Sequence, residues 1–369
     1  MDAIGREPSK PATVVAIIMA GGSGERFWPA SRLDRPKQFL RLGWRETMFQ
    51  AAVKRISPLV EASWIFPVTG ERYLHVIGEQ APEIPAEQII IEPMGRNTAA
   101  CLALAAFHLR AVFPGEDPVM VVLASDHIIQ REEHFLEILR AAIRASLTED
   151  NAFILGIPPT GPNTGYGYIH YDKASAGEVD GVAIHAVRGF REKPNRDTAQ
   201  EYLATGEYLW NSGMFIWKTS FFLELLAEHL PRHYEKLSGA FHHGKPSREE
   251  LAEAFAGLTS VSVDYGIMEK TNRIRVIPAE IGWDDVGNWA GMAAHLPAQG
   301  SNTVIGEATL LETQGCLIYS DGGHIATVGM EDTVVVKIGQ TVLVCPKNRA
   351  QDVRRIVEEL RRQGRQDLL

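Results

Sequence analysis

Short apolar runs alternate with longer amphipathic stretches along the first 160 residues of the chain. The runs are rich in β-branched residues and predict strands at Val14–Ala20, Trp64–Val68, Gln88–Ile91, Val119–Ala124 and Ala152–Gly156. The stretches between them predict helices at Met48–Ile56, Glu71–Glu79, Thr98–Val112 and Glu132–Leu147. Strands that are apolar on both faces and separated by helices form βαβ units. The pattern therefore predicts an α/β fold, with a Rossmann-like, mostly parallel sheet flanked by helices.

The carboxyl ends of these predicted strands mark the place where we expect a ligand. In open α/β sheets the ligand lies in the crevice beyond those ends. The positions of interest are the ones that follow Ala20, Ile91 and Ala124.

The pattern changes twice in the rest of the chain. A strand-rich stretch contains candidate strands at Gly167–Tyr171, Val182–Phe190 and Leu209–Trp217, and helices follow to about Met268. The segment Glu280–Trp289 has the character of a loop that enters a helix at Val286.

Beyond Pro297, short strands are separated by Gly and Asp turns. They are Leu310–Leu311, Cys316–Tyr319, Ile325–Val328, Val334–Ile338 and Thr341–Val344. A final amphipathic helix carries apolar positions from Ala350 to Leu360, with Gly364 as its C-cap. We predict a main domain at 1–296 and a small, β-helix-like all-β domain at 297–369 that ends in a helix.

Composition and charge narrow the class of protein. Apolar residues make up 45% and charged residues 22%, as in ordinary globular proteins. No apolar run reaches the ~18 residues of a transmembrane helix, and the N-terminus lacks a signal-peptide layout. The net charge of −9 disfavours a nucleic-acid binder. Cys101, Cys316 and Cys345 fit thiols in a reducing compartment. We expect a cytoplasmic protein that binds neither membrane nor nucleic acid.

One segment is basic although the whole chain is acidic. Six Lys and Arg residues lie between Arg26 and Arg45, and only Asp34 opposes them. This local excess of positive charge predicts that the segment holds an anion.

A glycine-rich loop, Ala20–Arg26, directly follows the first predicted strand. Its three glycines let backbone N–H groups converge on an anion. It is not a dinucleotide fingerprint, because Phe27 stands where a third glycine is needed, and it lacks the Gly-Lys-Ser/Thr of a P-loop. A tight turn would explain the glycines alone, but the basic cluster beside them favours a phosphate site.

A series of motifs resembles the signature of sugar-phosphate nucleotidylyltransferases, and within them the mannose-1-phosphate guanylyltransferase group. In chain order the motifs are Gly21–Pro29, Ser31–Arg32, Pro36–Phe39, Glu92–Pro93, Arg96–Ala99, Asp126–His127, Tyr166–Ile169, Glu192–Pro194, Trp210–Phe215, Asp264–Tyr265, Met268–Glu269, Trp283 and Asp285–Gly287. The resemblance implies the nucleotidyltransferase fold, with 1–296 as the catalytic domain. The long isomerase half of bifunctional members does not follow Pro297, so we expect no isomerase activity.

The resemblance implies transfer of GMP from GTP to α-D-mannose 1-phosphate, which gives GDP-mannose and pyrophosphate. The attacking phosphate monoester has a second pKa of ~6 and is already ionised at pH 7, so the reaction requires no general base. The difficulty is the repulsion between two anions, which cationic side chains and Mg²⁺ can offset.

The resemblance also assigns residues to these tasks. Arg26 and Lys37 match triphosphate-binding positions, and Asp126 and Asp285 match Mg²⁺-binding aspartates; on physical grounds the adjacent Asp284 is equivalent. The expected nucleotide-binding residues are Ala20, Gly21, Gly22, Ser23, Gly24, Glu92, Arg96, Asn97 and Thr98. The expected sugar-phosphate-binding residues are Tyr166, Gly167, Glu192, Lys193, Asn211 and Asp264.

Ordinary structural roles compete with these assignments. An N-cap or an Asx turn would account for Asp126, Asp285, Asn211 and Asp264, and Asn97 with Thr98 could cap the following helix. Two other functions stay open. One is a related nucleotidylyltransferase with a different nucleotide or hexose, and the other is a non-catalytic nucleotide-sugar sensor. Relatives with such a C-terminal unit imply a homodimer.

Overall fold

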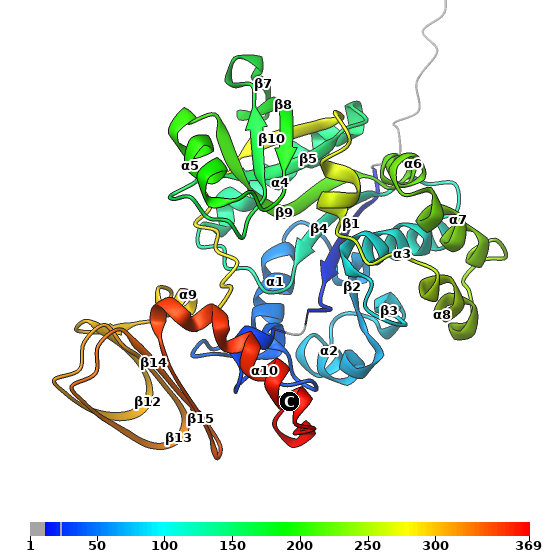
Figure 1. Cartoon of the computed structure of the whole chain (residues 1–369). Coiled ribbons are helices and arrows are strands. Elements are labelled where there is room, and N and C mark those ends of the chain that lie inside the picture. The colour runs from blue at the N-terminus through cyan, green and yellow to red at the C-terminus, as the bar shows by residue number, and fades with distance from the viewer. Residues whose placement is uncertain (1–11, 23) are drawn as a thin grey trace, which may run out of the picture.

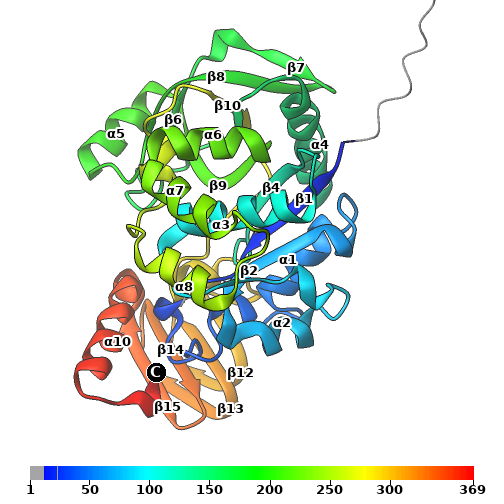
Figure 2. The same ribbon diagram turned by 90° about the vertical axis from the view of Figure 1, so that its right-hand side faces the viewer.

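The computed structural model describes residues 12–22 and 24–369. Figures 1 and 2 show a large sheet with helices on both faces, beside which lies a smaller sheet built from the end of the chain.

The two halves of the large sheet differ in strand direction: one half is parallel, and the other contains antiparallel pairs. The strands of this sheet are β1 (Val14–Met19), β2 (Ile65–Gly70), β3 (Ile90–Glu92), β4 (Val119–Ala124), β5 (Ala152–Ile157), β6 (Tyr168–Tyr171), β7 (Gly177–Val179), β8 (Val182–Arg191), β9 (Tyr208–Lys218) and β10 (Ile274–Pro278). They run in the order β3-β2-β1-β4-β9-β5-β10-β8-β6, with β7 on β8. Pairing is parallel among β3, β2, β1 and β4 and between β5 and β10, whereas β9 is antiparallel to its three partners β4, β5 and β6.

Helices cover both faces of this sheet, as the alternation of strands and helices predicts. They are α1 (Met48–Ile56), α2 (Leu74–Gln80), α3 (Asn97–Val112), α4 (Glu132–Thr148), α5 (Arg196–Thr205), α6 (Thr219–His229), α7 (Pro231–Ala240) and α8 (Arg248–Ala256). Alternate β1 residues serve the two faces: Val15 and Ile17 pack with α3, α6, α7 and α8, while Ala16 and Ile18 pack with α1, α2 and α4. The predicted α/β class with a Rossmann-like core is confirmed.

The smaller sheet comprises β11 (Ala298–Gln299), β12 (Asn302–Leu311), β13 (Leu317–Val328), β14 (Thr333–Ile338) and β15 (Thr341–Pro346). Its central strands β12, β13 and β14 are parallel, as in stacked β-helix rungs, and β15 returns antiparallel to β14. The two remaining helices are α9 (Trp289–Ala293) and α10 (Val353–Arg362).

The small sheet packs on the N-terminal part of the main domain through a shared apolar core. Phe27 and Trp28 meet Trp289 of α9 and Val353 and Val357 of α10 in this core. The helix α10, red in Figure 1, lies beside the blue N-terminal segment that follows β1. The division of the chain at 296/297 stays a prediction, since this core includes residues from both sides of it.

Local structure departs from the sequence-based prediction in several places; for example, β12 covers Asn302–Leu311, where only Leu310–Leu311 was predicted. The predicted helix start at Val286 is wrong: α9 begins at Trp289, and Val286 has a φ of 45°, outside the right-handed helical region. Strand β10 was not predicted, and it lies fully inside the sheet between β5 and β8. The strands predicted at Cys316–Tyr319 and Ile325–Val328 form one continuous strand, β13.

Candidate active site

Two adjoining cavities lie beyond the carboxyl ends of β1 and β4. The basic cavity, of about 480 Å³, is lined by Gly24, Glu25, Arg26, Phe27, Lys37, Asp126, His127, Asp285, Gly287 and Arg354. The inner cavity, of about 430 Å³, is lined by residues of both halves of the large sheet and includes Gly21, Gly22, Glu92, Gly167, Glu192, Asn211 and Asp264. Asp126, His127 and Asp285 line both cavities. These three residues therefore stand where the two cavities meet.

Hydrogen bonds from Gln38 hold the start of the glycine-rich loop. This buried side chain donates from Nε2 to the carbonyl oxygens of Ala20 at 3.0 Å and Gly22 at 3.1 Å. Thr69 at the end of β2 donates a further hydrogen bond to the Ala20 carbonyl. Because these carbonyl groups are bound on the protein side, the backbone at Ala20 and Gly22 is held in place before any ligand arrives. Ser23, which we predicted as a nucleotide contact, lies outside the described residues.

Gly24 gives the loop its close approach to Lys37. The glycine has a φ of 59°, and a Cβ atom on it would lie 2.5 Å from Cβ of Lys37. Only a glycine fits this position without displacing the lysine. The glycine at position 24 therefore allows the loop backbone to lie directly against the Lys37 side chain.

Lys37 ties the two predicted metal-binding aspartates together. Its Nζ donates to Asp126 Oδ2 at 3.0 Å and to the backbone oxygen of Asp285 at 2.7 Å. The lysine is 4% exposed, so its charge is largely removed from water and acts on its neighbours with little screening. Burial is the largest single influence and alone would raise the pKa of Asp126, but the Lys37 ammonium and the other nearby contacts together outweigh it and lower that pKa. Asp126 is therefore ionised at neutral pH.

Asp285 is oriented from the opposite side by aromatic residues. Tyr166 donates from its hydroxyl to Asp285 Oδ1 at 2.8 Å, and its ring packs edge-on against Trp210 and Trp283. Trp283 in turn donates from Nε1 to Nδ1 of His127 at 3.1 Å. Burial lowers the pKa of His127, so this imidazole is neutral and acts as a packing and hydrogen-bonding residue.

Asp284, which the sequence could not separate from Asp285, has a different environment. Its carboxylate accepts from the Val286 N–H at 2.7 Å and lies 2.8 Å from His295 Nε2, and it lines neither of the two cavities. These contacts hold the turn in which Val286 takes its positive φ. A β-branched residue in that conformation is strained, and such strain is typical of functional loops. Asp284 therefore shapes the turn, and Asp285 faces the cavities.

The carboxylates at the junction fit a hard divalent cation. The hydrogen bonds from Lys37 and Tyr166 use Oδ2 of Asp126 and Oδ1 of Asp285, so each carboxylate keeps a second oxygen for a cation. Within residues 12–22 and 24–369, no cluster of three or more His, Cys, Asp or Glu side chains forms a complete metal cage. Mg²⁺ needs no such cage, because it takes one or two carboxylates together with substrate phosphates and water.

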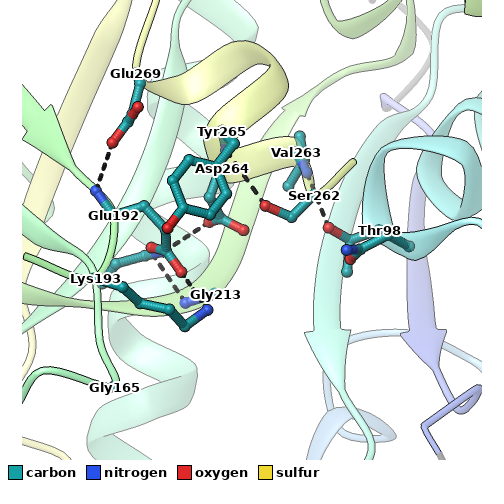
Figure 3. Close-up of polar contacts among 12 residues, drawn as sticks. Thr98, Gly165, Glu192, Lys193, Gly213, Ser262, Val263, Asp264, Tyr265 and Glu269 are labelled. Atoms are coloured by element: carbon teal, nitrogen blue, oxygen red, sulfur yellow. Dashed lines mark hydrogen bonds and ion pairs between the residues drawn. The ribbon is translucent and has the colours of Figure 1, made fainter. Parts of the chain in front are cut away.

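On the far side of the inner cavity, predicted sugar-phosphate residues make two sets of hydrogen bonds, and Figure 3 shows Glu192, Lys193 and Asp264 among them. In the first set, Lys193 donates to Glu192 Oε1 at 2.6 Å, and the Glu192 N–H donates to Glu269 Oε1. In the second set, Asn211 donates to Asp264 Oδ1 at 2.8 Å. Burial raises the pKa values of Glu192 and Asp264. Glu269 was not predicted as a site residue, although it stands in one of the recognised motifs.

One oxygen of these residues has no partner. Glu192 is 6% exposed, and its Oε2 has no hydrogen-bond donor within the described part of the chain. The same oxygen lies 2.5 Å from where a Cβ atom would stand on Gly167. A buried, unpartnered acceptor is costly by ~1–3 kcal/mol. Its position beside a required glycine at the cavity wall suits a ligand hydroxyl.

Two of the predicted nucleotide-binding residues, Gly21 and Glu92, lie together on a cavity wall, whereas Arg96 does not. Gly21 and Glu92 adjoin, since a Cβ on Gly21 would lie 3.2 Å from Glu92 Oε2, and burial raises the pKa of Glu92 to about 7. Both also line a third cavity of about 950 Å³ between β3 and α8. Arg96 instead donates to the carbonyl oxygen of Phe255 in α8 and lines none of these three cavities.

Asn97 and Thr98 join the site to the start of α3. Asn97 has a φ of 66° and accepts the Thr98 N–H at its own Oδ1, while Thr98 Oγ1 accepts from the Val263 N–H (Figure 3). These bonds fix the helix start against the segment that carries Asp264. Both residues line the inner cavity, as predicted, but the predicted capping role is wrong: the N-cap position of α3 is Arg96, and no side chain accepts a capping hydrogen bond there.

Comparisons with known proteins agree with this geometry. Residues 15–298 match the family described as nucleotidyl transferase, and residues 306–360 match a mannose-phosphate isomerase/GMP-like β-helix domain. The chain therefore belongs to the nucleotidyl transferase family, whose members generally use a divalent metal.

The relatives of this chain show which group within the family it resembles. A mannose-1-phosphate guanylyltransferase of Escherichia coli K12 is 40% identical over 362 residues, which cover 95% of this chain and 74% of the relative. The alginate biosynthesis protein AlgA of Pseudomonas aeruginosa is 34% identical and covers 96% and 73%. A solved structure from Thermus thermophilus, named mannose-1-phosphate geranyltransferase, has a TM-score of 0.84 at 37% identity and covers 95% and 99%. The chain groups with the mannose-1-phosphate guanylyltransferases, and the family implies a nucleotide and a sugar phosphate as substrates.

Among the described residues, no helix has the length and apolar character that a membrane span requires.

Proposed function

We propose that this chain transfers GMP from GTP to α-D-mannose 1-phosphate and releases GDP-mannose and pyrophosphate. A phosphate oxygen of the sugar phosphate attacks the α-phosphorus of GTP, and the bond from that phosphorus to the bridging oxygen of the leaving pyrophosphate breaks. The observation that carries the proposal is the meeting of two cavities at Asp126 and Asp285, one with fixed cations and one with hydrogen-bonding acceptors.

The basic cavity suits the triphosphate. Lys37 is buried and held at two points, so it presents its charge without reorganising during the reaction. Arg26 is exposed at the cavity wall, where its forked guanidinium can bind phosphate oxygens. The loop Gly21–Gly24 would supply backbone N–H groups. Together these groups reduce the repulsion between the attacking and the attacked phosphates.

Mg²⁺ fits the junction, where Asp126 and Asp285 would hold it. When bound, it neutralises phosphate charge and polarises the phosphorus–oxygen bonds. Lys37 keeps Asp126 ionised, and Tyr166 fixes the direction of Asp285, so both carboxylates are ready as ligands before substrate binds.

The hexose would lie in the inner cavity against Gly167. Glu192 Oε2 would accept a hydrogen bond from a sugar hydroxyl, and Asn211 and Asp264 would contact other hydroxyl groups. Each unmatched polar group costs ~1–3 kcal/mol, so a hexose that places a hydroxyl differently is rejected. Lys193 stands beside Glu192 and would reach the sugar phosphate.

The substrate range can be tested directly. We expect pyrophosphate release from GTP and mannose 1-phosphate with Mg²⁺, and loss of release when EDTA removes the metal. UTP, dTTP, ATP and CTP, and glucose or galactose 1-phosphate, should each react at least about tenfold more slowly. A preference for UTP or dTTP would favour another sugar nucleotidylyltransferase. No turnover with any pair, while GDP-mannose still binds, would favour a sensor.

Glu92 provides a pH-dependent test of the guanine contact. An ionised Glu92 can accept from guanine N1–H and N2–H, but its pKa of about 7 leaves it partly protonated in the free protein. Below that pH the carboxyl must lose a proton to bind, so we expect GTP affinity to fall as the pH drops and to level off above pH 7.

Glu92→Gln should weaken the binding of GTP about tenfold and remove this component of the pH dependence. Calorimetric titration of both proteins over the same pH range checks it. Because the phosphates titrate identically in both, an unchanged pH profile in Glu92→Gln would contradict the assignment.

A further inference from the structure

The C-terminal helix α10 contributes one side chain to the basic cavity. Arg354 lines that cavity together with Arg26 and Lys37, although most of the printed sequence separates it from the loop after β1. In the preceding turn, Gln351 Nε2 lies 3.8 Å from the Cβ position of Gly287, close to Asp285. Ligand sites are frequent at junctions between structural units, and here the junction closes one wall of the cavity.

The placement of Arg354 is fixed by the packing of α10. Val353 and Val357, one helical turn apart, are buried in the core shared with Phe27 and Trp28. The end of the chain is bound as well, because Trp28 donates from Nε1 to the Leu368 carbonyl oxygen at 2.8 Å. The helix therefore cannot rotate without losing buried apolar contacts, and Arg354 stays directed toward the loop.

Arg354 is paired only loosely with carboxylates among the described residues. The contacts from Nε reach Glu25 Oε2 at 3.5 Å and Glu358 Oε1 at 3.2 Å. No hydrogen bond joins the Arg354 guanidinium to another described residue, so this side chain can still form forked bonds to phosphate from its terminal nitrogens. The second arginine on Glu25, Arg361, makes its ion pair from Nη2 and does not line the cavity.

The charge balance of the cavity explains why a third cation matters. Its wall carries three cationic side chains, Arg26, Lys37 and Arg354, and three carboxylates, Glu25, Asp126 and Asp285. Without Arg354 the carboxylates would outnumber the cations in a space that must hold a triphosphate. We infer that Arg354 binds the β- and γ-phosphate groups of GTP, and therefore the pyrophosphate product, through its terminal nitrogens. This inference rests on the proposed function.

The reaction run in reverse isolates this contact, because pyrophosphate and GDP-mannose then bind as separate substrates. We expect Arg354→Gln to raise KM for pyrophosphate and for GTP about tenfold. The KM values for GDP-mannose and mannose 1-phosphate should change less than about twofold, since neither carries the groups that Arg354 contacts. Arg354→Lys keeps one charge but loses the fork, so it should restore part of the affinity.

Two neighbouring arginines give matched controls. Arg355 is on the same helix but does not line the cavity. Its side chain is 73% exposed and makes a long ion pair of 3.9 Å with Asp352, so Arg355→Gln should leave all four KM values unchanged. Arg361→Gln removes a partner of Glu25 without removing a cation from the cavity, so it tests whether Arg354 acts only by holding Glu25. Equal effects of Arg354→Gln and Arg361→Gln, or no effect of Arg354→Gln, would overturn the inference. An inactive wild-type protein would instead refute the proposed function, and unchanged near-UV circular dichroism establishes that each variant is folded.

Discussion

Asp285→Ala is expected to lower kcat by about a hundredfold to a thousandfold while the protein stays folded. The variant removes one of the two carboxylates proposed to hold Mg²⁺ at the reacting phosphates, and losses of this size are typical when one element of charge stabilisation is deleted. Asp285 is partly exposed and makes one side-chain hydrogen bond, from Tyr166, so little folding energy depends on it. Initial rates of pyrophosphate release at saturating substrates, with a thermal melt of each variant, provide the measurement.

The neighbouring aspartate is the matched control for this prediction. Asp284→Asn keeps the oxygen that accepts from the Val286 N–H and disturbs only the contact with His295. The loss of one hydrogen bond is worth ~1 kcal/mol, so kcat should fall by no more than about fivefold. If both substitutions reduced kcat equally, Asp285 would have no special role, and the assignment of the metal-binding aspartates would be wrong.

Lys37→Met is expected to have a comparable effect for a different reason. Methionine fills much of the lysine's volume but removes the charge proposed to act on the triphosphate, so kcat/KM for GTP should fall about a hundredfold or more. It also removes the cation that lowers the pKa of Asp126, so that pKa should rise in the variant. Steady-state kinetics measure the first effect, and a carbon-13 titration of the Asp126 carboxyl measures the second.

A surface lysine separates this effect from a general loss of charge. Lys54 is 72% exposed and pairs with Glu46 outside the cavities, so Lys54→Met should leave kcat/KM unchanged. An Asp126 pKa that did not move in Lys37→Met would contradict the electrostatic coupling, whatever happened to the rate.

Much of the scaffold could be predicted from the sequence, because its elements are dictated locally. The strand Val119–Ala124 and the helix Met48–Ile56 have the predicted bounds, since each combines a clear apolar pattern with a definite end. For the helix this end is a capping box at Thr47 and Gln50. The boundary at Val286 failed for the opposite reason. Its positive φ depends on the hydrogen bond to Asp284 and also on burial in a core formed by distant segments, and local sequence does not encode that burial.

Some residues of the candidate site could likewise be predicted from the sequence, and others could not. Motifs next to strand ends, such as the glycine-rich loop and Asp126, could be found because the ends of parallel strands meet at one edge of the sheet. Arg354 could not be found, because it reaches the cavity only through the docking of α10 on Phe27 and Trp28. The difference between Asp284 and Asp285 likewise depends on which side of one turn each carboxylate faces, which residue type and spacing do not encode.

The most direct test of the proposed site is a crystal structure of the protein soaked with GDP-mannose and Mn²⁺, with anomalous diffraction recorded at the manganese edge. We expect a single anomalous peak within bonding distance of Asp126 and Asp285, with the diphosphate beside Lys37 and the hexose against Gly167. A diphosphate bound away from the glycine-rich loop, or a metal held by other carboxylates, would contradict the account.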